Sequence, residues 1–335
     1  MSGALRWPRL RVLVDGAPVA GAFEADVSAN SHFAADRFMV SLAVGADPVA
    51  LLDLVDRADI TVDVQASLDD GAGFARLVTG DADRVEYDPM AGVVRLEGRD
   101  FSARLMEARR GESFVNLTSS EIATTLASRH GLVADVRDTK VPVGRLWEGN
   151  HQRTQLDQFS RATTEWDLLA ALADIEGFDL FVTGNTLSFR PADTEAAPLP
   201  LSLGDASAVR LERALTLAGG IEVVVRSWSA ERQQLCEERA TRAGSRARQY
   251  IYVVPNLTAS EAAALAQRRL DAIGRHERVV RLEMPGELDI APRGRISLAG
   301  SGTGFDQVYW VDRVERRIGR HGFRQTVHAR NNNTE

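Results

Sequence analysis

The chain has 335 residues, a formal net charge of −7 and 44% hydrophobic residues, which is typical of a soluble protein with two or three domains. The acidic balance argues against a general nucleic-acid binder, because such proteins neutralise phosphates with a basic face. With Cys236 as its only cysteine, the chain can form neither an intrachain disulfide nor a thiolate metal cluster, and no apolar run approaches the roughly 20 residues of a membrane span.

The first segment, residues 1–105, is predicted to fold as an antiparallel sandwich or barrel. Apolar and polar residues alternate as in half-buried strands, and Asp15-Gly16 is a strong turn sequence. A short helix is predicted after Asp47, which can cap it, with Pro48 at its first position. The expected strands are 10–14, 23–27, 38–44, 60–65, 77–78, 84–87 and 93–97.

The middle segment, residues 106–200, changes period and is predicted to be a small α+β domain. Thr118 and Glu121 form the pattern of a capping box ahead of a helix that ends at Gly131. A second helix is predicted over 155–176, followed by a hairpin of 178–182 and 187–189. Residues 191–200 contain three prolines, which predict a linker.

The last segment, residues 201–335, returns to the strand pattern and is assigned to a second barrel. Thr258 and Glu261 repeat the capping box and open a helix over 262–273, which ends at Gly274. The predicted fold class is therefore mainly β, with two similar antiparallel barrels flanking the α+β domain. The expected strands are 214–217, 221–227, 249–254, 278–283, 295–299, 307–315 and 323–329.

A set of ordered matches indicates that the two barrels are copies of one fold. The sequence Gly-x-Gly-Phe at 71–74 recurs at 302–305, and Asp-Arg-Val-Glu at 83–86 recurs at 312–315. The later pair Arg99 and Arg330 keeps nearly the same offset of about 230 residues. One such match is easily obtained by chance, whereas several in order are not. Two similar domains in one subunit let a small ring imitate a ring with twice as many members.

Residue patterns give little support for catalysis. The six histidines show no metal-binding spacing, and the glycine-rich run 300–304 lacks the following helix that would aim amides at a phosphate. Asp53 with Asp56, or Asp167 with Asp174, could serve as a glycosidase acid and base, although solvated helix faces explain them better. We predict no catalytic residue, no metal and no cofactor.

Two arginine-rich stretches, 239–248 and 313–324, stand out against the acidic background. Two interpretations remain open: they dock acidic neighbours or touch DNA in transit, or they are solvated hairpin tips. The candidate contact residues are Arg242, Arg246, Arg248, Arg316, Arg317 and Arg320.

Several segments, taken in order, resemble the tail hub proteins of contractile-tailed phages, the late-control D family. The segments are LEGRDFSARL at 96–105, FVNLTSSEIA at 114–123, the run from QLDQFSRATTEWDLLAALA at 155–173 into GFDLFVTGNTLSF at 177–189, and MPGELDIAPRGRISLAG at 284–300. The resemblance covers nearly the whole chain, and the order of the segments carries it.

The resemblance implies a non-enzymatic baseplate hub in the virion tail, assembled in the host cytoplasm. Three copies would form a pseudo-sixfold ring that joins the hexameric tail tube to the trimeric spike. The implied partners are the tail tube protein, the spike protein, a tape-measure protein and baseplate wedge proteins, with DNA only in transit and no membrane. Because the sequence ends soon after the second barrel, we expect a spike needle or a lysozyme to be a separate protein.

Two rival functions differ in what they require. A tail-associated peptidoglycan hydrolase or glycosidase would need a cleft with two poised carboxylates in 106–200. A carbohydrate-binding receptor module would need exposed aromatic platforms, whereas aromatic residues make up only 6% of the chain.

Overall fold

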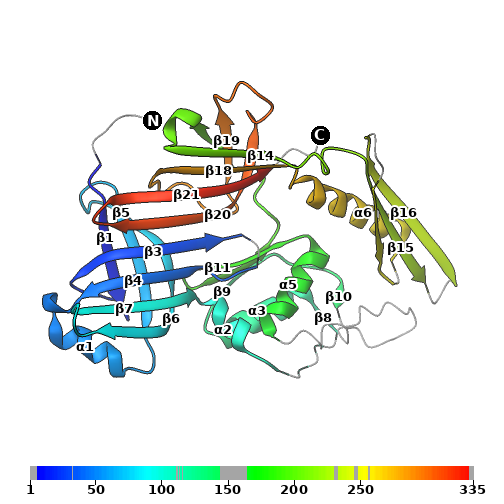
Figure 1. Cartoon of the computed structure of the whole chain (residues 1–335). Coiled ribbons are helices and arrows are strands. Elements are labelled where there is room, and N and C mark those ends of the chain that lie inside the picture. The colour runs from blue at the N-terminus through cyan, green and yellow to red at the C-terminus, as the bar shows by residue number, and fades with distance from the viewer. Residues whose placement is uncertain are drawn as a thin grey trace.

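The computed structural model describes residues 6–31, 33–110, 112, 114, 116–143, 164–229, 233–244, 248–255 and 257–331. The fold is mainly β, with two antiparallel barrels and an α+β domain between them in the chain, as predicted (Figure 1). A 13-stranded sheet runs through both barrels, so they form one continuous surface.

The first barrel contains seven strands in the order β3-β4-β7-β6-β5-β1-β2. The predicted strands 77–78 and 84–87 are parts of one long strand, β6. Helix α1 (Pro48–Asp56) begins as predicted, with the Asp47 carboxylate accepting the Ala50 amide at 3.1 Å, and the 3-10 helix η1 (Val44–Ala46) precedes it. The strands are β1 (Arg9–Val14), β2 (Ala17–Pro18), β3 (Ala22–Asn30), β4 (Arg37–Ala43), β5 (Thr61–Ser67), β6 (Ala75–Asp88) and β7 (Val93–Asp100).

The α+β domain packs its helices around an apolar core of its own, which includes Trp166 and Leu169. The capping box of Thr118 and Glu121 is present at the start of α3. The predicted second helix is observed as α5, which ends at Gly177 in the left-handed conformation, while residues 155–163 lie outside the described residues. The elements are α2 (Ser102–Glu107), β8 (Leu117–Thr118), α3 (Ser119–Arg129), β9 (Val133–Val136), β10 (Pro142–Val143), α5 (Glu165–Glu176), β11 (Asp179–Thr183) and β12 (Thr186–Arg190).

In the second barrel, strand β14 lies at residues that the sequence did not assign to a strand, and two other segments also differ from the prediction. Residues 199–200, assigned to the linker, begin strand β13, where Pro200 is tolerated because β13 pairs on one side only. Residues 214–217, predicted as a strand, form a turn in which the Leu217 amide donates to the Ala214 carbonyl at 2.9 Å. The elements are β13 (Leu199–Ser202), η2 (Leu203–Asp205), β14 (Ala208–Arg213), β18 (Arg278–Pro285), β19 (Arg295–Ala299), β20 (Val308–Gly319) and β21 (Gly322–Asn331).

Residues 221–274 form a separate unit between β14 and β18, which we call the β15–α6 unit (Figure 1). The sequence assigned these strands to the second barrel, but they pair only with one another and bury their apolar side against α6. Helix α6 starts at the predicted capping box of Thr258 and Glu261. The unit contacts the α+β domain through an ion pair of Arg269 with Asp174 at 2.6 Å. Its elements are β15 (Ile221–Ser229), β16 (Gln234–Arg242), β17 (Arg248–Val253) and α6 (Ala259–Gly274).

Strand pairing repeats between the barrels. The order β3-β4-β7-β6-β5 in the first corresponds to β14-β18-β21-β20-β19 in the second. The register shifts by one residue at Asp83 in β6 and at Asp312 in β20, which are equivalent positions in the sequence repeat. Each bulge aspartate binds the equivalent arginine of the next strand: Arg99 at 2.6 Å in the first barrel and Arg330 at 3.0 Å in the second.

The two barrels join where β20 pairs with β3, so that residues 313–318 of β20 lie opposite residues 25–30 of β3. The elements of the first barrel end at Asp100, and those of the second begin at Leu199. The domain boundaries at 105 and 200 stay predictions.

Candidate functional site

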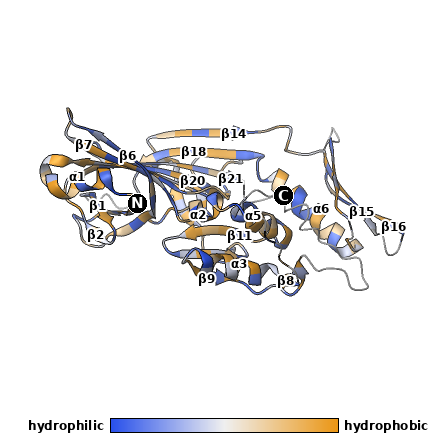
Figure 2. Ribbon diagram, turned by 90° about the horizontal axis from the view of Figure 1, so that it is seen from below, coloured by the Kyte–Doolittle hydropathy of each residue, from blue (hydrophilic) through white to orange (hydrophobic). Residues whose placement is uncertain are grey.

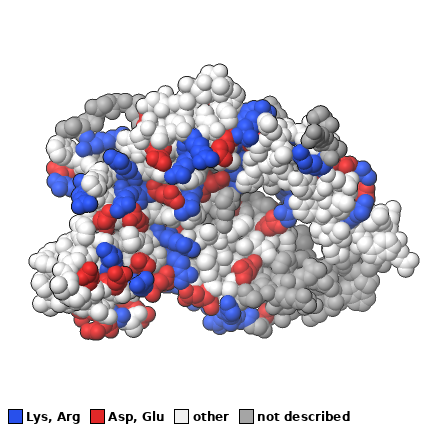
Figure 3. Space-filling model, in the orientation of Figure 1, with Lys and Arg blue, Asp and Glu red and all other residues white. Residues whose placement is uncertain are grey.

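One face of the large sheet is lined by charged side chains from both barrels (Figure 3). Because successive residues of a strand point to opposite faces, the apolar residues of each strand enter a core while its polar residues share this face. Hydrophilic and hydrophobic residues alternate along β18 in this way (Figure 2). We call this surface the charged face; its charged residues include Glu24, Asp26, Arg37, Arg84, Glu86, Arg95, Glu97, Arg99, Arg210, Glu212, Arg281, Glu283, Arg313, Glu315, Arg317 and Arg324.

Ion pairs neutralise much of the charged face. Arg317 on β20 binds Glu24 at 2.5 Å and Asp26 at 3.6 Å on β3, and so crosses the junction between the barrels. Arg313 binds Glu315 at 2.6 Å on its own strand. Such exposed pairs contribute about 0–1 kcal/mol each to stability, but they leave little net charge of either sign on the surface.

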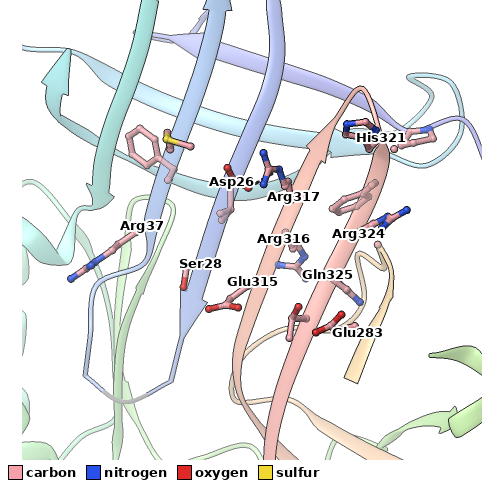
Figure 4. A pocket seen from close by; sticks show the side chains of 18 of the residues that line it. Asp26, Ser28, Arg37, Glu283, Glu315, Arg316, Arg317, His321, Arg324 and Gln325 are labelled. Carbon is pink, nitrogen blue, oxygen red and sulfur yellow. Dashed lines mark ion pairs between the residues drawn. The ribbon is translucent and has the colours of Figure 1, made fainter. Parts of the chain in front are cut away.

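The charged face is hollowed over the junction. The hollow has a volume of about 1290 Å³ and is lined by residues of β3, β4, β20 and β21, among others. Asp26 and Arg317 lie side by side in it, on the neighbouring strands β3 and β20 (Figure 4). Withdrawal from water raises the pKa of Asp26, although Arg317 partly opposes that shift. The hollow therefore has both apolar and charged lining residues, and Arg317 is paired with the acids of β3 inside it.

The arginines predicted in 313–324 occupy different surroundings. Arg316 points into the protein, where it donates to the carbonyls of Glu287 at 3.4 Å and of Ile290; burial lowers its pKa to about 10. Arg317 lies at the junction, and Arg320 lies at the β20–β21 turn, with its Nε 3.0 Å from Nε2 of His321.

The arginines predicted in 239–248 belong to the β15–α6 unit. Arg242 is largely buried and lies 3.7 Å from Glu277. Arg248 donates to the carbonyl of Thr216, and Arg246 lies outside the described residues. The structure thus does not gather the predicted arginines into one patch, and their role in contacts stays a prediction.

A second group of charged residues lies where the three parts of the chain meet. Arg293, in the loop before β19, donates to the Asn30 carbonyl at 2.6 Å and stacks over the Phe181 ring at 4.0 Å. Nearby, Asp100 is buried and accepts the amide of Asp36 at 3.0 Å. Withdrawal from water and the charge of Asp100 raise the pKa of Asp36 to about 7. This junction cluster therefore connects both barrels and the α+β domain.

The carboxylates suggested for catalysis, Asp53, Asp56, Asp167 and Asp174, all lie at exposed positions of helices. Asp53 and Asp56 lie on the outer side of α1, and Asp174 is bound by Arg269. In the α+β domain, buried Glu165 binds Arg129 and His130, at 2.5 Å each. These contacts are typical of an anchoring carboxylate.

The glycine-rich run 300–304 also has a structural explanation. The amides of Ser301 and Gly302 donate to the Asp306 carboxylate at 2.9 and 3.0 Å. The Ser301 side chain and these amides together lower the pKa of Asp306. Within the described ranges, no three metal-ligating side chains come together, and no helix is long and apolar enough to cross a membrane.

Sequence reasoning missed the open edges of the large sheet. In the described part of the chain, β14 pairs only with β18. Residues 84–88 of β6 pair only with β7, because the pairing of β6 with β5 ends at Asp81. Apolar side chains are exposed at both edges, with Tyr87 at 37% and Val209 at 38%. Finding these edges required knowledge of which strands pair, which alternation alone does not provide.

Comparison with known proteins assigns a family. The family model described as the Alg8 N-terminal domain matches residues 77–320. The chain belongs to the Alg8 N-terminal domain family. This description names a domain and no reaction. No curated protein matches the sequence.

Solved structures establish the fold. The chain is similar to the 43 kDa tail protein of prophage MuSo2 from Shewanella oneidensis, with 18% identity, a TM-score of 0.73 and coverage of 96% of this chain and 98% of that one. It is similar to a tail protein from Neisseria meningitidis, with 16% identity, a TM-score of 0.74 and coverage of 97% of both chains.

A more distant likeness is to an E. coli component of the type VI secretion system, itself similar to T4 bacteriophage tail proteins, with 10% identity, a TM-score of 0.58 and coverage of 95% and 76%. The chain therefore has the fold of phage tail proteins, and the predicted resemblance is confirmed at the level of the fold.

Proposed function

We propose that the chain is the structural hub of a contractile phage tail or of a related injection particle, located in the tail baseplate of the virion after assembly in the host cytoplasm. Three copies form a ring in which six similar barrels alternate. This ring joins a hexameric tail tube to a trimeric spike. The observation that carries the proposal is the duplicated barrel within one continuous sheet, since one subunit then presents two equivalent surfaces.

The charged face suits the wall of a channel. A DNA-binding surface gains affinity by presenting unpaired cations to phosphates, whereas here Arg317, Arg313 and Arg99 are each held by a carboxylate. A surface of paired charges is well hydrated and has little net attraction for a passing polyanion or polypeptide. We propose that this face lines the lumen, through which DNA or a tape-measure protein passes.

We propose no catalytic step for the chain. Glu165 forms ion pairs with Arg129 and Arg110, and Asp174 forms one with Arg269, which are the contacts of anchoring carboxylates. Incubation with purified peptidoglycan is expected to release no soluble sugar or peptide, whereas measurable turnover would favour a tail-associated hydrolase.

The test of the ring is the mass and shape of the purified protein. At micromolar concentration and moderate salt, light scattering is expected to give three times the chain mass of 36.5 kDa, and negative-stain images are expected to show a threefold ring with a central hole. A stable monomer under these conditions would refute the proposal.

A further inference from the structure

The open edges of the large sheet can be matched to each other by the internal repeat. Strand β6 corresponds to β20, and β14 corresponds to β3. Within the chain, β20 and β3 pair and join the two barrels. Their equivalents, β6 and β14, lie at the two ends of the eight-strand run β14-β18-β21-β20-β3-β4-β7-β6, where they have no partner for these edges among the described residues.

We propose that β6 of one copy pairs with β14 of a second copy in the register of the internal β20–β3 junction. The inference rests on the proposed ring, and it specifies which residues meet at each subunit boundary. A second copy is the occupant that fits the open edge of β6. It supplies β14, which the repeat makes equivalent to β3, and β3 is the strand that pairs with β20 inside the chain.

The register follows from equivalent steps across the sheet. Gly98 in β7 corresponds to Ala329 in β21, since each precedes the arginine that binds the bulge aspartate. Two steps across the sheet lead from Gly98 to Val27 in β3. The same two steps from Ala329 lead to Leu211 in β14. Val27 and Leu211 are therefore equivalent.

The other strand of the boundary is placed in the same way. Arg316 and Tyr87 each lie four residues after their bulge aspartate, and Arg316 pairs with Val27 inside the chain. Tyr87 of one copy therefore lies opposite Leu211 of the next. The next pair along the antiparallel strands brings Asp88 opposite Arg210.

The side chains at these positions are complementary. At the internal junction an arginine on β20 meets acids on β3, Arg317 with Glu24 and Asp26. At the proposed boundary the polarity is reversed, with the acid Asp88 on β6 and the cation Arg210 on β14. Opposite charges directly across a strand pair are favourable.

The apolar and like-charged positions fit the same register. Tyr87, 37% exposed in the single chain, meets Leu211 on the core side of the sheet, so the boundary covers both. Glu86 lies opposite Glu212, but Arg95 binds Glu86 at 3.1 Å, and Arg210 lies between Glu212 of its own copy and Asp88 of the other. Closing the ring in this way also removes exposed sheet edges, which otherwise promote aggregation.

Cysteine cross-linking tests the register. The double variant Asp88→Cys/Arg210→Cys, made with Cys236→Ser, places two thiols directly across the proposed boundary, within the Cα separation of roughly 4.4–6.8 Å that a disulfide needs. Mild oxidation is expected to give covalent dimers and trimers on a non-reducing gel. The matched control Asp88→Cys/Glu212→Cys tests a slip of two residues and is expected to cross-link at least tenfold more slowly.

The outcomes separate this inference from the proposed function. A trimer that cross-links faster through the control, or through neither pair, would overturn the register and leave the ring intact. A monomer that never cross-links would overturn both. A charge-swap series needs no oxidation: Arg210→Asp is expected to weaken the trimer at least tenfold, and adding Asp88→Arg is expected to restore it. Failure of the second change to restore assembly would also contradict the pairing.

Discussion

Replacement of Arg293 by methionine tests the junction cluster that holds both barrels and the α+β domain together. Position 293 has a φ of +67°, which is strained for any residue with a side chain. Methionine has an unbranched stem like that of arginine, so this backbone strain is nearly the same in the variant and in the original protein. What is lost is the guanidinium, with its hydrogen bond to the Asn30 carbonyl at 2.6 Å and its contact with the Phe181 ring.

The expected cost is about 3 kcal/mol at pH 8. A hydrogen bond to a charged group contributes about 1.5–3 kcal/mol and a cation–π contact about 0.5–1 kcal/mol. The charge of Arg293 also lowers the pKa of Asp36, so its removal raises that pKa beyond about 7. Loss of a partner from a buried ionic group costs about 3–5 kcal/mol, which agrees with the upper part of this range.

The cost should depend on pH in a defined direction. Because the pKa of Asp36 is raised from 3.8 to about 7 in the folded protein, its contribution to stability is greatest in acid and is lost as the pH rises through 7. At pH 5.5 Asp36 is protonated and needs Arg293 less. Because pH 8 lies only one unit above the pKa of about 7, the loss at pH 8 can exceed the loss at pH 5.5 by at most about 1.4 kcal/mol through this group, however far the variant raises its pKa.

Urea unfolding at the two pH values measures this effect. Tryptophan fluorescence can follow unfolding, and Trp166, one of five tryptophans, has its indole hydrogen-bonded to the Phe33 carbonyl at 2.6 Å, close in sequence to Asp36. The control Arg9→Met removes an exposed ion pair with Asp70 and should cost at most about 1 kcal/mol. Adding Asp36→Asn to the Arg293 variant should recover part of the loss at pH 8. An equal loss at both pH values would refute the reasoning.

Two further substitutions test the packing. Gly286→Ala should lower the free energy of unfolding by more than about 3 kcal/mol, because the new Cβ would lie 2.3 Å from the Phe323 ring. The control Gly204→Ala has its nearest neighbouring atom at 3.7 Å and should change it by less than about 1 kcal/mol. Equal urea midpoints for the two variants would contradict this. Leu169→Ala leaves a cavity at a fully buried position in the core of the α+β domain and should cost about 2–5 kcal/mol of stability. Hydrogen exchange should show reduced protection of α3 and α5. The control Val133→Ala, at an exposed position, should leave that protection unchanged.

Local patterns in the sequence predicted local structure well. The capping boxes at Thr118 and Thr258 and the aspartate cap at Asp47 each start a helix as expected, because a cap depends on residues within one turn. The repeat also predicted equivalent strands, and the matched bulges at Asp83 and Asp312 support it.

The errors about which sheet a strand joins, and which side of a strand a residue occupies, come from long-range pairing. Alternation identified β15 and β17 as strands, but their partners decide which sheet they join, and α6 covers them instead of the barrel. Arg316 belongs to an arginine-rich stretch, yet it lies on the core side of β20 and satisfies backbone carbonyls there. A charge count cannot show on which side of a strand a residue lies. The open edges of β6 and β14 escaped prediction for the same reason.

The position of the β15–α6 unit bears on how a ring of these barrels would look from its two ends. The unit replaces the connection that corresponds to the short β3–β4 loop, and it lies beside the α+β domain at one end of the large sheet (Figure 1). At the opposite end the first barrel carries α1 and the β1–β2 turn, where the second barrel has the loop 286–294 and no equivalent of that turn among the described residues. If three chains close into a ring, one rim would repeat nearly every 60° and the other only every 120°. The ring would then have nearly sixfold symmetry at one rim and threefold symmetry at the other, because the β15–α6 unit is inserted in only one of the two barrels of each chain.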